Sequence, residues 1–442
     1  MTLQTQPQPR TRTRTALVIG GGIAGATTAL ALRRAGIEAT VYEAYDSTAD
    51  GIGGGLTLAP NGLNALDAIG AADLVRDIGS PMTAIVLHSW NGKQLAEFGT
   101  PPGVAPMQFV WRTELYRALY AEAVANGVGI VHGKRLVRAE QDGEGVTAHF
   151  ADGSSAGADL LIGADGIHST VRSIIDPAAP QPRYAGLVSF GAQVRDSGLA
   201  STEGRTLMSF GKRAFFGWWT TEPEGTGRDG ARRDGSDRDG TAVWFANLPR
   251  TEPMTAAEAH AVGAEEWLRV LTTAFADDRS PALDLLRRTD PADLLITGPM
   301  ESMPEVPVWH RGRMVLLGDS AHAASSSSGQ GASLAIESAV QLARCLRDLP
   351  QHQALTAYEQ LRRPRVERII KAAARTNSNK TPGPVGRVVR DAVMPLAMKL
   401  VKPEKMAWQY EYRINWSEPV PAPSTAATGA RTGSAAPASH SA

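Results

Sequence analysis

The chain of 442 residues carries 45 basic and 45 acidic residues, is 43% hydrophobic and contains one cysteine, Cys345. A formal net charge of zero gives no electrostatic attraction for a polyanion such as DNA, and one cysteine excludes an internal disulfide and a cysteine-based metal site. We therefore expect a globular protein that binds small molecules and neither nucleic acid nor a metal.

The N-terminal segment 1–15 includes three arginines but no apolar stretch long enough for a secretory signal. No window of the sequence reaches the ~18 uninterrupted apolar residues that a transmembrane helix requires. These observations predict a cytoplasmic protein without a transmembrane segment.

A β-α-β unit opens the predicted folded region. The apolar residues 16–19 precede the turn Gly20-x-Gly22-x-x-Gly25, and a helix then leads to a second strand that ends at Glu43. Glycines let the backbone approach a pyrophosphate closely, while the amides at the helix start face its negative charge. Glu43 is placed to accept both ribose hydroxyls of an adenosine group, and it would repel a 2′-phosphate.

Two further glycine motifs follow. A strand at 159–162 leads into Gly163-Ala164-Asp165-Gly166, and a strand at 313–317 leads into Gly318-Asp319, ahead of a long helix that starts at Gly329-Gln330-Gly331. Between them, residues 187–248 are β-like and rich in aromatic pairs, except for the Gly, Asp and Arg-rich segment 221–240, which is predicted to be a hairpin tip or linker. Three glycine motifs in this order predict an FAD site.

The predicted fold class is α/β, with a Rossmann-like FAD-binding lobe of the glutathione reductase type, an inserted and mostly antiparallel β-sheet lobe for the substrate, and C-terminal helices. The expected divisions are a disordered N-terminus (1–14), the first part of the FAD lobe (15–180), the substrate lobe (181–300), the return to the FAD lobe (301–375), a C-terminal helical segment (376–416) and a disordered tail (417–442).

The motifs resemble those of class A flavin-dependent monooxygenases, the para-hydroxybenzoate hydroxylase-like group. The resemblance covers residues 15–375, and its middle motif is the most specific because in that family it serves both FAD and the transient docking of NAD(P)H. The quoted segments are Gly20-Gly21-Gly22-Ile23-Ala24-Gly25, Gly163-Ala164-Asp165-Gly166-Ile167-His168-Ser169-Thr170-Val171-Arg172 and Gly318-Asp319-Ser320-Ala321-His322.

The resemblance implies roles for individual residues. Asp319 would accept hydrogen bonds from the ribityl chain, the helix start at Gly329-Gln330-Gly331 would face the flavin N1–C2 edge, and Arg112 would contact the ribose and phosphate region. The glycine-rich segment 51–61 resembles the loop that lets the flavin ring swing between positions. The expected cofactor-binding residues are Gly20, Gly22, Ala24, Gly25, Glu43, Gly54, Gly55, Arg112, Asp165, Asp319, Gly329, Gly331 and Ala332.

The family's chemistry belongs to the cofactor: NADH or NADPH reduces FAD, and the reduced flavin forms a C4a-hydroperoxide that transfers one oxygen atom to the substrate. We therefore expect no catalytic nucleophile or base, and we expect His322 and His168 to be buried structural histidines. One departure from the family is Ser325-Ser326-Ser327-Ser328, where the family usually has prolines. This loop is predicted to be more mobile and more polar against the flavin.

The expected substrate is a small aromatic, indole-type or polycyclic molecule, because aromatic side chains suit a flat substrate and the composition resembles that of oxygenases of secondary metabolism. No charged residue of the sheet stands out as an anchor for a carboxylate. The predicted pocket wall consists of Phe190, Gln193, Phe210, Phe216, Trp218 and Trp244.

Several alternatives remain open, among them an epoxidase of an unsaturated terpenoid or polyketide and a flavin-binding redox protein with low turnover. Flavin halogenases have a Trp-x-Trp segment and Baeyer–Villiger monooxygenases have a second dinucleotide fingerprint, and the sequence contains neither. The residues after 416 are too few and too polar for the thioredoxin-like domain of phenol hydroxylase-like relatives. The basic, apolar stretch 388–402 either caps the protein's own core or docks on a membrane or carrier.

Overall fold

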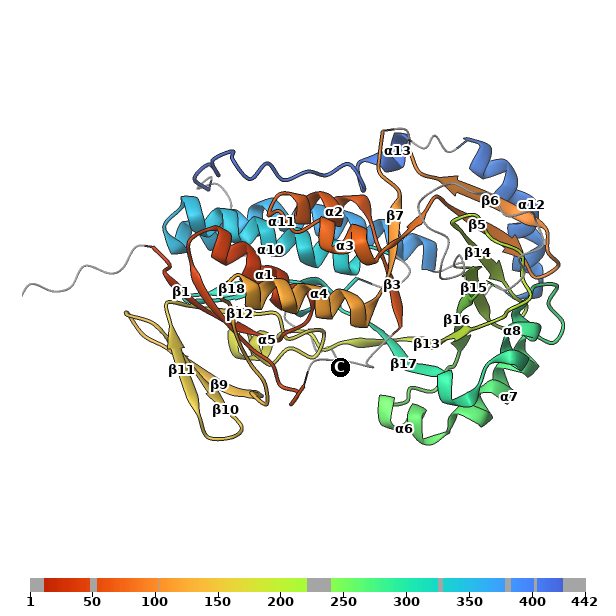
Figure 1. Cartoon of the computed structure of the whole chain (residues 1–442), viewed down its shortest axis with the longest axis horizontal. Coiled ribbons are helices and arrows are strands. Elements are labelled where there is room, and N and C mark those ends of the chain that lie inside the picture. Colours follow the sequence, from red (N-terminus) through yellow and green to blue (C-terminus); the bar gives the residue numbers. More distant parts are fainter. Residues whose placement is uncertain are drawn as a thin grey trace, which may run out of the picture.

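The structure is a computed structural model, and it describes residues 12–47, 54–101, 103–220, 240–324, 329–377, 383–400 and 404–423. These residues form two lobes, which are connected by two long paired strands, β13 (Arg183–Val194) and β17 (Leu295–Ser302) (Figure 1). The predicted segments 1–11, 325–328 and 424–442, and most of 221–240, lie outside the described residues.

A six-stranded sheet forms the centre of the first lobe. Its order is β18-β19-β12-β1-β2-β8, and all neighbours are parallel except β18 at the edge. The central strands are continuous apolar runs because helices cover both faces of a parallel sheet. The strands are β1 (Thr15–Ile19), β2 (Glu38–Tyr42), β8 (Gly129–Val131), β12 (Leu160–Gly163), β18 (His310–Arg311) and β19 (Met314–Leu316).

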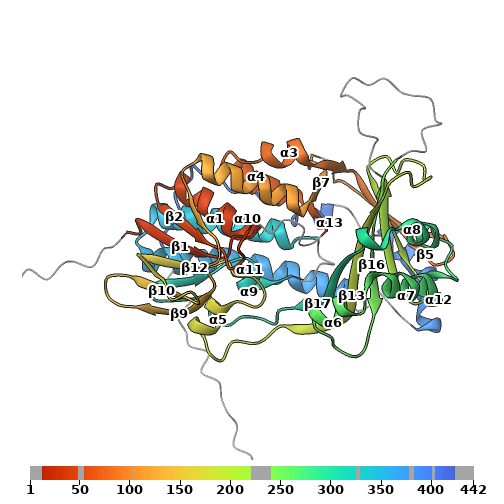
Figure 2. The ribbon, with the colours of Figure 1, turned by 60° about the horizontal axis from the view of Figure 1, so that its bottom comes forward.

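Helices pack around this sheet and against one another (Figure 2). Helix α1 contacts both α4 and α10, and α10 also contacts α2 and α11. Small buried side chains on α1, such as Ala26 and Ala29, allow these close approaches. The helices of this lobe are α1 (Ile23–Arg34), α2 (Pro60–Asp67), α3 (Asp73–Ile78), α4 (Arg112–Ala125), α5 (Thr170–Ile175), α9 (Asp319–His322), α10 (Gly331–Asp348) and α11 (Gln351–Asn377).

Two small antiparallel sheets complete the first lobe and its border with the second. One has the order β11-β10-β9 and lies beside α5, and the other has the order β3-β7-β4 and leads toward the second lobe. Their strands are β9 (Leu136–Gln141), β10 (Val146–Phe150), β11 (Ser155–Ala158), β3 (Gly55–Leu58), β4 (Ser80–Met82) and β7 (Met107–Trp111).

A seven-stranded sheet of the order β17-β13-β16-β15-β14-β5-β6 forms the second lobe, and only the pair β14 and β5 is parallel. Strands β5 and β6 correct the expected division, which assigned residues 84–99 to the first lobe. Their partner β14 lies far along the chain, so local patterning does not reveal which sheet they join. The strands not yet given are β5 (Ala84–Ser89), β6 (Gln94–Gly99), β14 (Arg205–Phe210), β15 (Phe215–Thr220) and β16 (Ala242–Pro249).

Helices α6, α7 and α8 lie beside this sheet (Figure 2). Side chains of α7 and α8 pack on its aromatic residues and bury them in a core. Helix α12 lies beside β6. The remaining helices are α6 (Ala256–Ala261), α7 (Ala264–Phe275), α8 (Ala282–Arg288), the 3-10 helix η1 (Pro291–Asp293), α12 (Pro384–Leu400) and α13 (Glu404–Ala407).

Helix α12 caps the second lobe with only one of its faces. Met394 packs near Phe210, and the guanidinium of Arg390 lies 4.6 Å from the centre of that phenylalanine ring. Large apolar side chains on its other face are exposed, namely Val385, Val388, Val389, Val393 and Leu396. Within the described residues, no helix combines the length and apolar character that a membrane crossing requires.

The C-terminal segment after α13 packs against α10 and α11, which corrects the expected start of the disordered tail at residue 417. The side chain of Val420 is 5% exposed, and its amide donates to Asp348 Oδ2 at 2.9 Å. Arg344 and Arg347 of α10 donate to the backbone carbonyls of Glu418 and Trp416. Composition alone missed this contact because the segment has few apolar side chains, and backbone carbonyl groups that accept from α10 add to the burial of Val420. At the other end of the chain, the amide of Arg14 donates to Asp159 Oδ2 at 2.8 Å.

Candidate functional site

The first glycine turn has no room for side chains. Gly20 has a φ of +96°, and a methyl group at this position would lie 2.5 Å from the carbonyl oxygen of Ala164. A methyl group on Gly25 would lie 1.9 Å from the carbonyl oxygen of Gly20. The turn therefore brings the start of α1 against β1 and against the second glycine motif, as close backbone approach to a pyrophosphate requires.

The N-termini of α1 and α10 have no acidic residue and no side-chain cap of their own. Neither N-cap residue, Gly22 for α1 and Gln330 for α10, has a side-chain capping hydrogen bond, and neither helix has an acidic residue in its first turn. The positive ends of both helix dipoles are therefore available to an anionic group. A dinucleotide with a pyrophosphate and an anionic ring edge fits this pair of helix starts.

Glu43 lies directly beside the first turn. Its carboxylate accepts hydrogen bonds from the amide of Gly21 at 2.6 Å and from the amide of Tyr45 at 2.9 Å. These two bonds fix the orientation of the carboxylate at the end of β2. A ribose bound along the turn would meet an acceptor at this point.

Two tyrosines that the sequence analysis did not select cover the turn from α4. A methyl group on Gly22 would lie 3.2 Å from Tyr116 Oη, and one on Gly21 would lie 2.0 Å from Tyr120 Oη. Arg112 donates from Nη2 to Tyr116 Oη at 3.3 Å. Arg112, Tyr116 and Tyr120 share one face of α4 because they are spaced four residues apart. This spacing from Arg112 was the signal available in the sequence.

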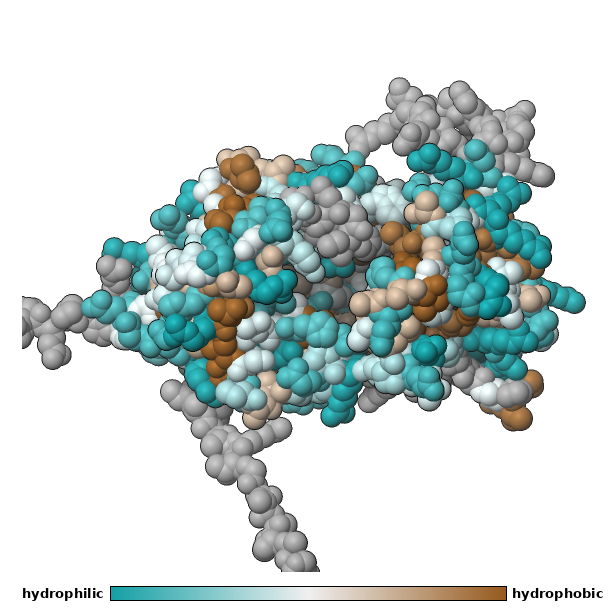
Figure 3. Space-filling view, turned by 90° about the horizontal axis from the view of Figure 1, so that it is seen from below, coloured by the Kyte–Doolittle hydropathy of each residue, from teal (hydrophilic) through white to brown (hydrophobic). Residues whose placement is uncertain are grey.

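Arg112 also connects two other predicted site residues. Its backbone amide donates to the carbonyl of Gly54 at 3.2 Å, and its positive charge acts on Asp319 at the start of α9. Desolvation by the surrounding protein raises the pKa of the Asp319 carboxyl, and the positive charge of Arg112 opposes that shift. The Asp319 side chain is exposed at the start of α9. Figure 3 shows that the surface is hollowed between the two lobes. An exposed carboxyl at this helix start can accept hydrogen bonds from a polar ligand.

The second motif is held to the third by buried polar contacts. Asp165 accepts hydrogen bonds from Ser169 Oγ at 2.5 Å and from the amide of Val171 at 3.0 Å, so its side chain caps α5. Burial raises the pKa of Asp165. Arg172 is 1% exposed and donates to the carbonyl oxygens of Ile167 at 2.7 Å and Ser320 at 3.2 Å. The Asp165 hydrogen bonds hold the turn of the second motif in shape, and the bond from Arg172 to the Ser320 carbonyl fixes the position of the turn at Asp319.

The two histidines that were expected to be structural differ. His322 is 4% exposed, and its Nε2 lies 3.0 Å from Ser338 Oγ. Burial, together with the charge of Arg362, lowers the pKa of His322 to about 3, so this ring is neutral at physiological pH. His168, by contrast, is 69% exposed and forms an ion pair with Glu301 of β17 at 2.8 Å, which corrects the expectation that it is buried.

Four of the six predicted pocket residues lie in the core under α7 and α8, which corrects their assignment to the pocket. Each packs against a helical side chain or a neighbouring core ring; for example, Trp244 donates from Nε1 to Thr289 Oγ1 at 3.0 Å. The four are Phe190, Phe216, Trp218 and Trp244. Phe210 is on the opposite face but is 7% exposed beneath Arg390. Only Gln193 is both on that opposite face and exposed.

The opposite face of the sheet meets the glycine-rich loop of the first lobe. A methyl group on Gly54 would lie 3.5 Å from Leu295 of β17, and Leu295 pairs with Gly191 of β13. The ring of Trp219 lies 4.5 Å from that of Phe109 on β7, which itself fills the space beside Gly55. The partly exposed aromatic residues on this side are Trp111, Trp219 and Phe245.

No charged side chain lies on this face in the two central strands. The residues that β15 and β16 contribute to it alternate with the buried set and are all neutral: Phe215, Gly217, Trp219, Val243, Phe245 and Asn247. Asn247 accepts a hydrogen bond from Ser189 at 3.0 Å. Among the described residues, there is no group of His, Cys, Asp and Glu that could hold a metal ion.

Comparisons with known proteins agree with this geometry. A family model described as an FAD binding domain matches residues 13–211 and 305–373. The chain is 33% identical over 372 residues to an FAD-dependent urate hydroxylase of Klebsiella pneumoniae, covering 81% of this chain and 88% of that protein. It is 32% identical over 407 residues to a 3-amino-4-hydroxybenzoate 2-monooxygenase of Streptomyces platensis, covering 89% and 95%. The structure of Klebsiella pneumoniae HpxO complexed with FAD and uric acid has a TM-score of 0.75 and 25% identity, covering 92% of this chain and 98% of that one.

Proposed function

Because the chain belongs to the family of class A FAD-dependent aromatic hydroxylases, we propose that it uses NADH or NADPH and O2 to insert one oxygen atom into a neutral, flat aromatic substrate of the indole or polycyclic type, in secondary metabolism. The observation that supports this substrate is the uncharged, partly aromatic surface that β15 and β16 present on this face of the second sheet. The guanidinium of Arg390 lies over Phe210 of β14, outside these two strands. A carboxylate would find no cation on the central strands of that face, whereas an aromatic ring would find Trp219 and Phe245.

The proposed FAD site is formed by the three glycine motifs. When bound, FAD supplies the redox and oxygen chemistry of the reaction. The starts of α1 and α10 would bind the pyrophosphate and the flavin edge, Glu43 the ribose, and Asp319 the ribityl chain. Gly20, Gly22, Gly25 and Gly54 allow close packing against neighbouring protein atoms, and we place all four beside the cofactor. Ala24, Gly55, Gly329, Gly331 and Ala332 remain proposed neighbours of the cofactor.

The protein's own task is to orient the substrate and to exclude water from it. Leu295, Phe109 and Trp219 form an apolar border where the second sheet meets the Gly54 loop. His322, whose pKa is lowered to about 3, carries no imidazolium proton that it could donate at physiological pH.

The proposal is tested by NADH and NADPH oxidation with the FAD-loaded protein. Each neutral arene in the panel, such as phenol or indole, is paired with its carboxylate, such as 4-hydroxybenzoate or indole-2-carboxylate. We expect the neutral member of a pair to stimulate oxygen uptake, to give little hydrogen peroxide, and to gain one atom of 18O from labelled O2. Faster coupled turnover of the carboxylates would contradict the substrate class, and no product from any compound would contradict the reaction.

Two adjacent tryptophans provide a matched test of the pocket wall. We expect Trp219→Leu to raise KM for the arene by about tenfold and to increase the share of peroxide, because a ring that contacts the substrate contributes ~1 kcal/mol or more. Trp218→Leu, whose side chain is in the core on the other face, should lower the melting temperature and leave KM within about twofold. Equal effects of both substitutions on KM would contradict this assignment.

A further inference from the structure

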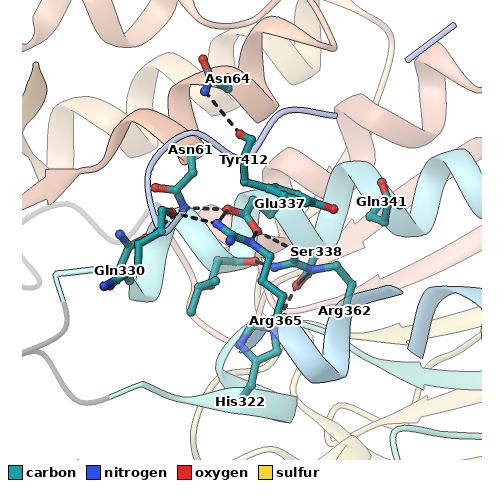
Figure 4. A network of polar contacts seen from close by, with 12 residues as sticks. Asn61, Asn64, His322, Gln330, Glu337, Ser338, Gln341, Arg362, Arg365 and Tyr412 are labelled. Carbon is teal, nitrogen blue, oxygen red and sulfur yellow. Dashed lines mark hydrogen bonds and ion pairs between the residues drawn. The ribbon is translucent and has the colours of Figure 1, made fainter. Parts of the chain in front are cut away.

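A buried ionic cluster lies behind the start of α10 (Figure 4). At its centre is Glu337, whose side chain has no exposed surface. Its carboxylate accepts hydrogen bonds from Arg362 Nη1 at 2.5 Å and from Nε and Nη2 of Arg365, both at 2.9 Å. Burial by itself would raise the pKa of Glu337, but the two guanidiniums outweigh it and the pKa is lowered. One carboxylate with two guanidiniums gives the cluster an excess of positive charge.

Asn61 of α2 joins this cluster to the N-cap residue of α10. Its side chain is fully buried, and its Nδ2 donates to Glu337 Oε1 at 2.6 Å and to Gln330 Oε1 at 2.9 Å. Gln330 is the N-cap of α10 and is 1% exposed. A continuous chain of polar contacts therefore runs from the charged centre to the residue at which α10 begins (Figure 4).

The first turns of α2 and α10 are also in direct contact. The amide of Ala59 donates to Ser333 Oγ at 3.0 Å, and a methyl group on Gly62 would lie 2.9 Å from the Cα of Ser333. Neither helix start has room to shift alone. Since α2 directly follows β3, which begins at Gly55, this strand, α2 and the start of α10 belong to one tightly packed unit.

We propose that Asn61 is a positioning residue for the flavin. It holds Gln330, and thereby the backbone amides of the first turn of α10, in the direction that stabilises negative charge on the flavin edge. This inference rests on the FAD site proposed above. Helix-end stabilisation acts only near the first turn, so the orientation of that turn decides its strength. A buried ion cluster gives little net stability but favours one arrangement of its partners, which suits such a role.

The test is the affinity of the FAD-loaded protein for sulfite, which adds to oxidised flavin and leaves negative charge on its ring. We expect Asn61→Ala to raise the sulfite dissociation constant about tenfold. An equal, tenfold loss of stability of the two-electron reduced flavin in the same variant would lower the flavin reduction potential by ~30 mV. Gln330→Ala should have the same effect, and the double variant should show no further loss because both substitutions break one link. If Asn61→Ala does not fold, Gln330→Ala carries the test.

Asn64→Ala is the matched control on α2. The Asn64 side chain donates to the carbonyl of Tyr412 at 3.3 Å, away from Gln330 (Figure 4), and its loss should change sulfite binding less than twofold. A sulfite constant for Asn61→Ala or Gln330→Ala within twofold of wild type would overturn the proposal, and so would an equal effect of Asn64→Ala. A wild-type protein that binds no FAD would overturn both this inference and the proposed function, whereas unchanged sulfite binding in an FAD-loaded variant overturns only the inference.

Discussion

Gly25→Val is expected to give a folded protein that no longer retains FAD. Even the first carbon of a side chain at residue 25 would lie 1.9 Å from the carbonyl oxygen of Gly20, so α1 must move away from β1. That movement withdraws the amides at the start of α1 from the pyrophosphate. We expect the FAD dissociation constant to rise at least about 100-fold, a loss of ~2.7 kcal/mol or more. Titration of the apoprotein with FAD, followed by flavin fluorescence, measures this dissociation constant.

Gly143→Ala is the control for this prediction. A methyl group at Gly143 would meet no atom within 4 Å, and the residue lies in the hairpin between β9 and β10, away from the turn. This variant should bind FAD like wild type. Circular dichroism of Gly25→Val should show that helix content is kept. A folded Gly25→Val protein with wild-type affinity for FAD would show that the turn does not hold the pyrophosphate.

The first β-α-β unit was predictable because its constraints are local. Close approach at Gly20 and Gly25 excludes side chains whatever the rest of the chain does, and an acidic residue at the end of the second strand follows from the spacing. The FAD-binding fold and the family were likewise accessible from three short motifs. Strands β5 and β6 were not, since their parallel pairing with β14 depends on residues far away in the sequence.

The pocket wall shows a different limit. Trp218 and Trp219 are adjacent, so they point to opposite faces of the sheet, and local pattern does not reveal which face meets the first lobe. The contact between Trp219 and Phe109 shows which face meets the first lobe. Phe109 belongs to β7, which is distant in sequence from both tryptophans. Tyr116 and Tyr120 were within reach of sequence analysis through their helical spacing from Arg112. Asn61 was not, because its partners Gln330 and Glu337 are more than 260 residues away.

Glu337→Gln is expected to be the most destabilising conservative substitution in the buried cluster. Arg362 has no exposed surface and depends on the Glu337 carboxylate for its charge balance. Removal of one partner of such a buried pair costs about 3–5 kcal/mol, because the other charge remains buried and uncompensated. Urea unfolding measures this loss. Glu359→Gln removes one of the two carboxylate partners of Arg363. The side chains of this ion pair are 19% and 26% exposed, so its loss should cost no more than about 1 kcal/mol.

The pH dependence separates this charge effect from a simple loss of packing. The folded-state pKa of Glu337 lies below its ordinary value, so its ionised form stabilises the folded protein above the unfolded-state pKa, and that contribution is lost as the pH falls through the folded-state pKa. The difference in unfolding free energy between wild type and Glu337→Gln should therefore be constant near neutral pH and shrink in acid. Adding Arg362→Met should recover part of the loss, since only one guanidinium, that of Arg365, would then remain beside residue 337 without a carboxylate partner. A difference that is independent of pH, or a double variant less stable than the single one, would show that Glu337 acts through packing rather than charge.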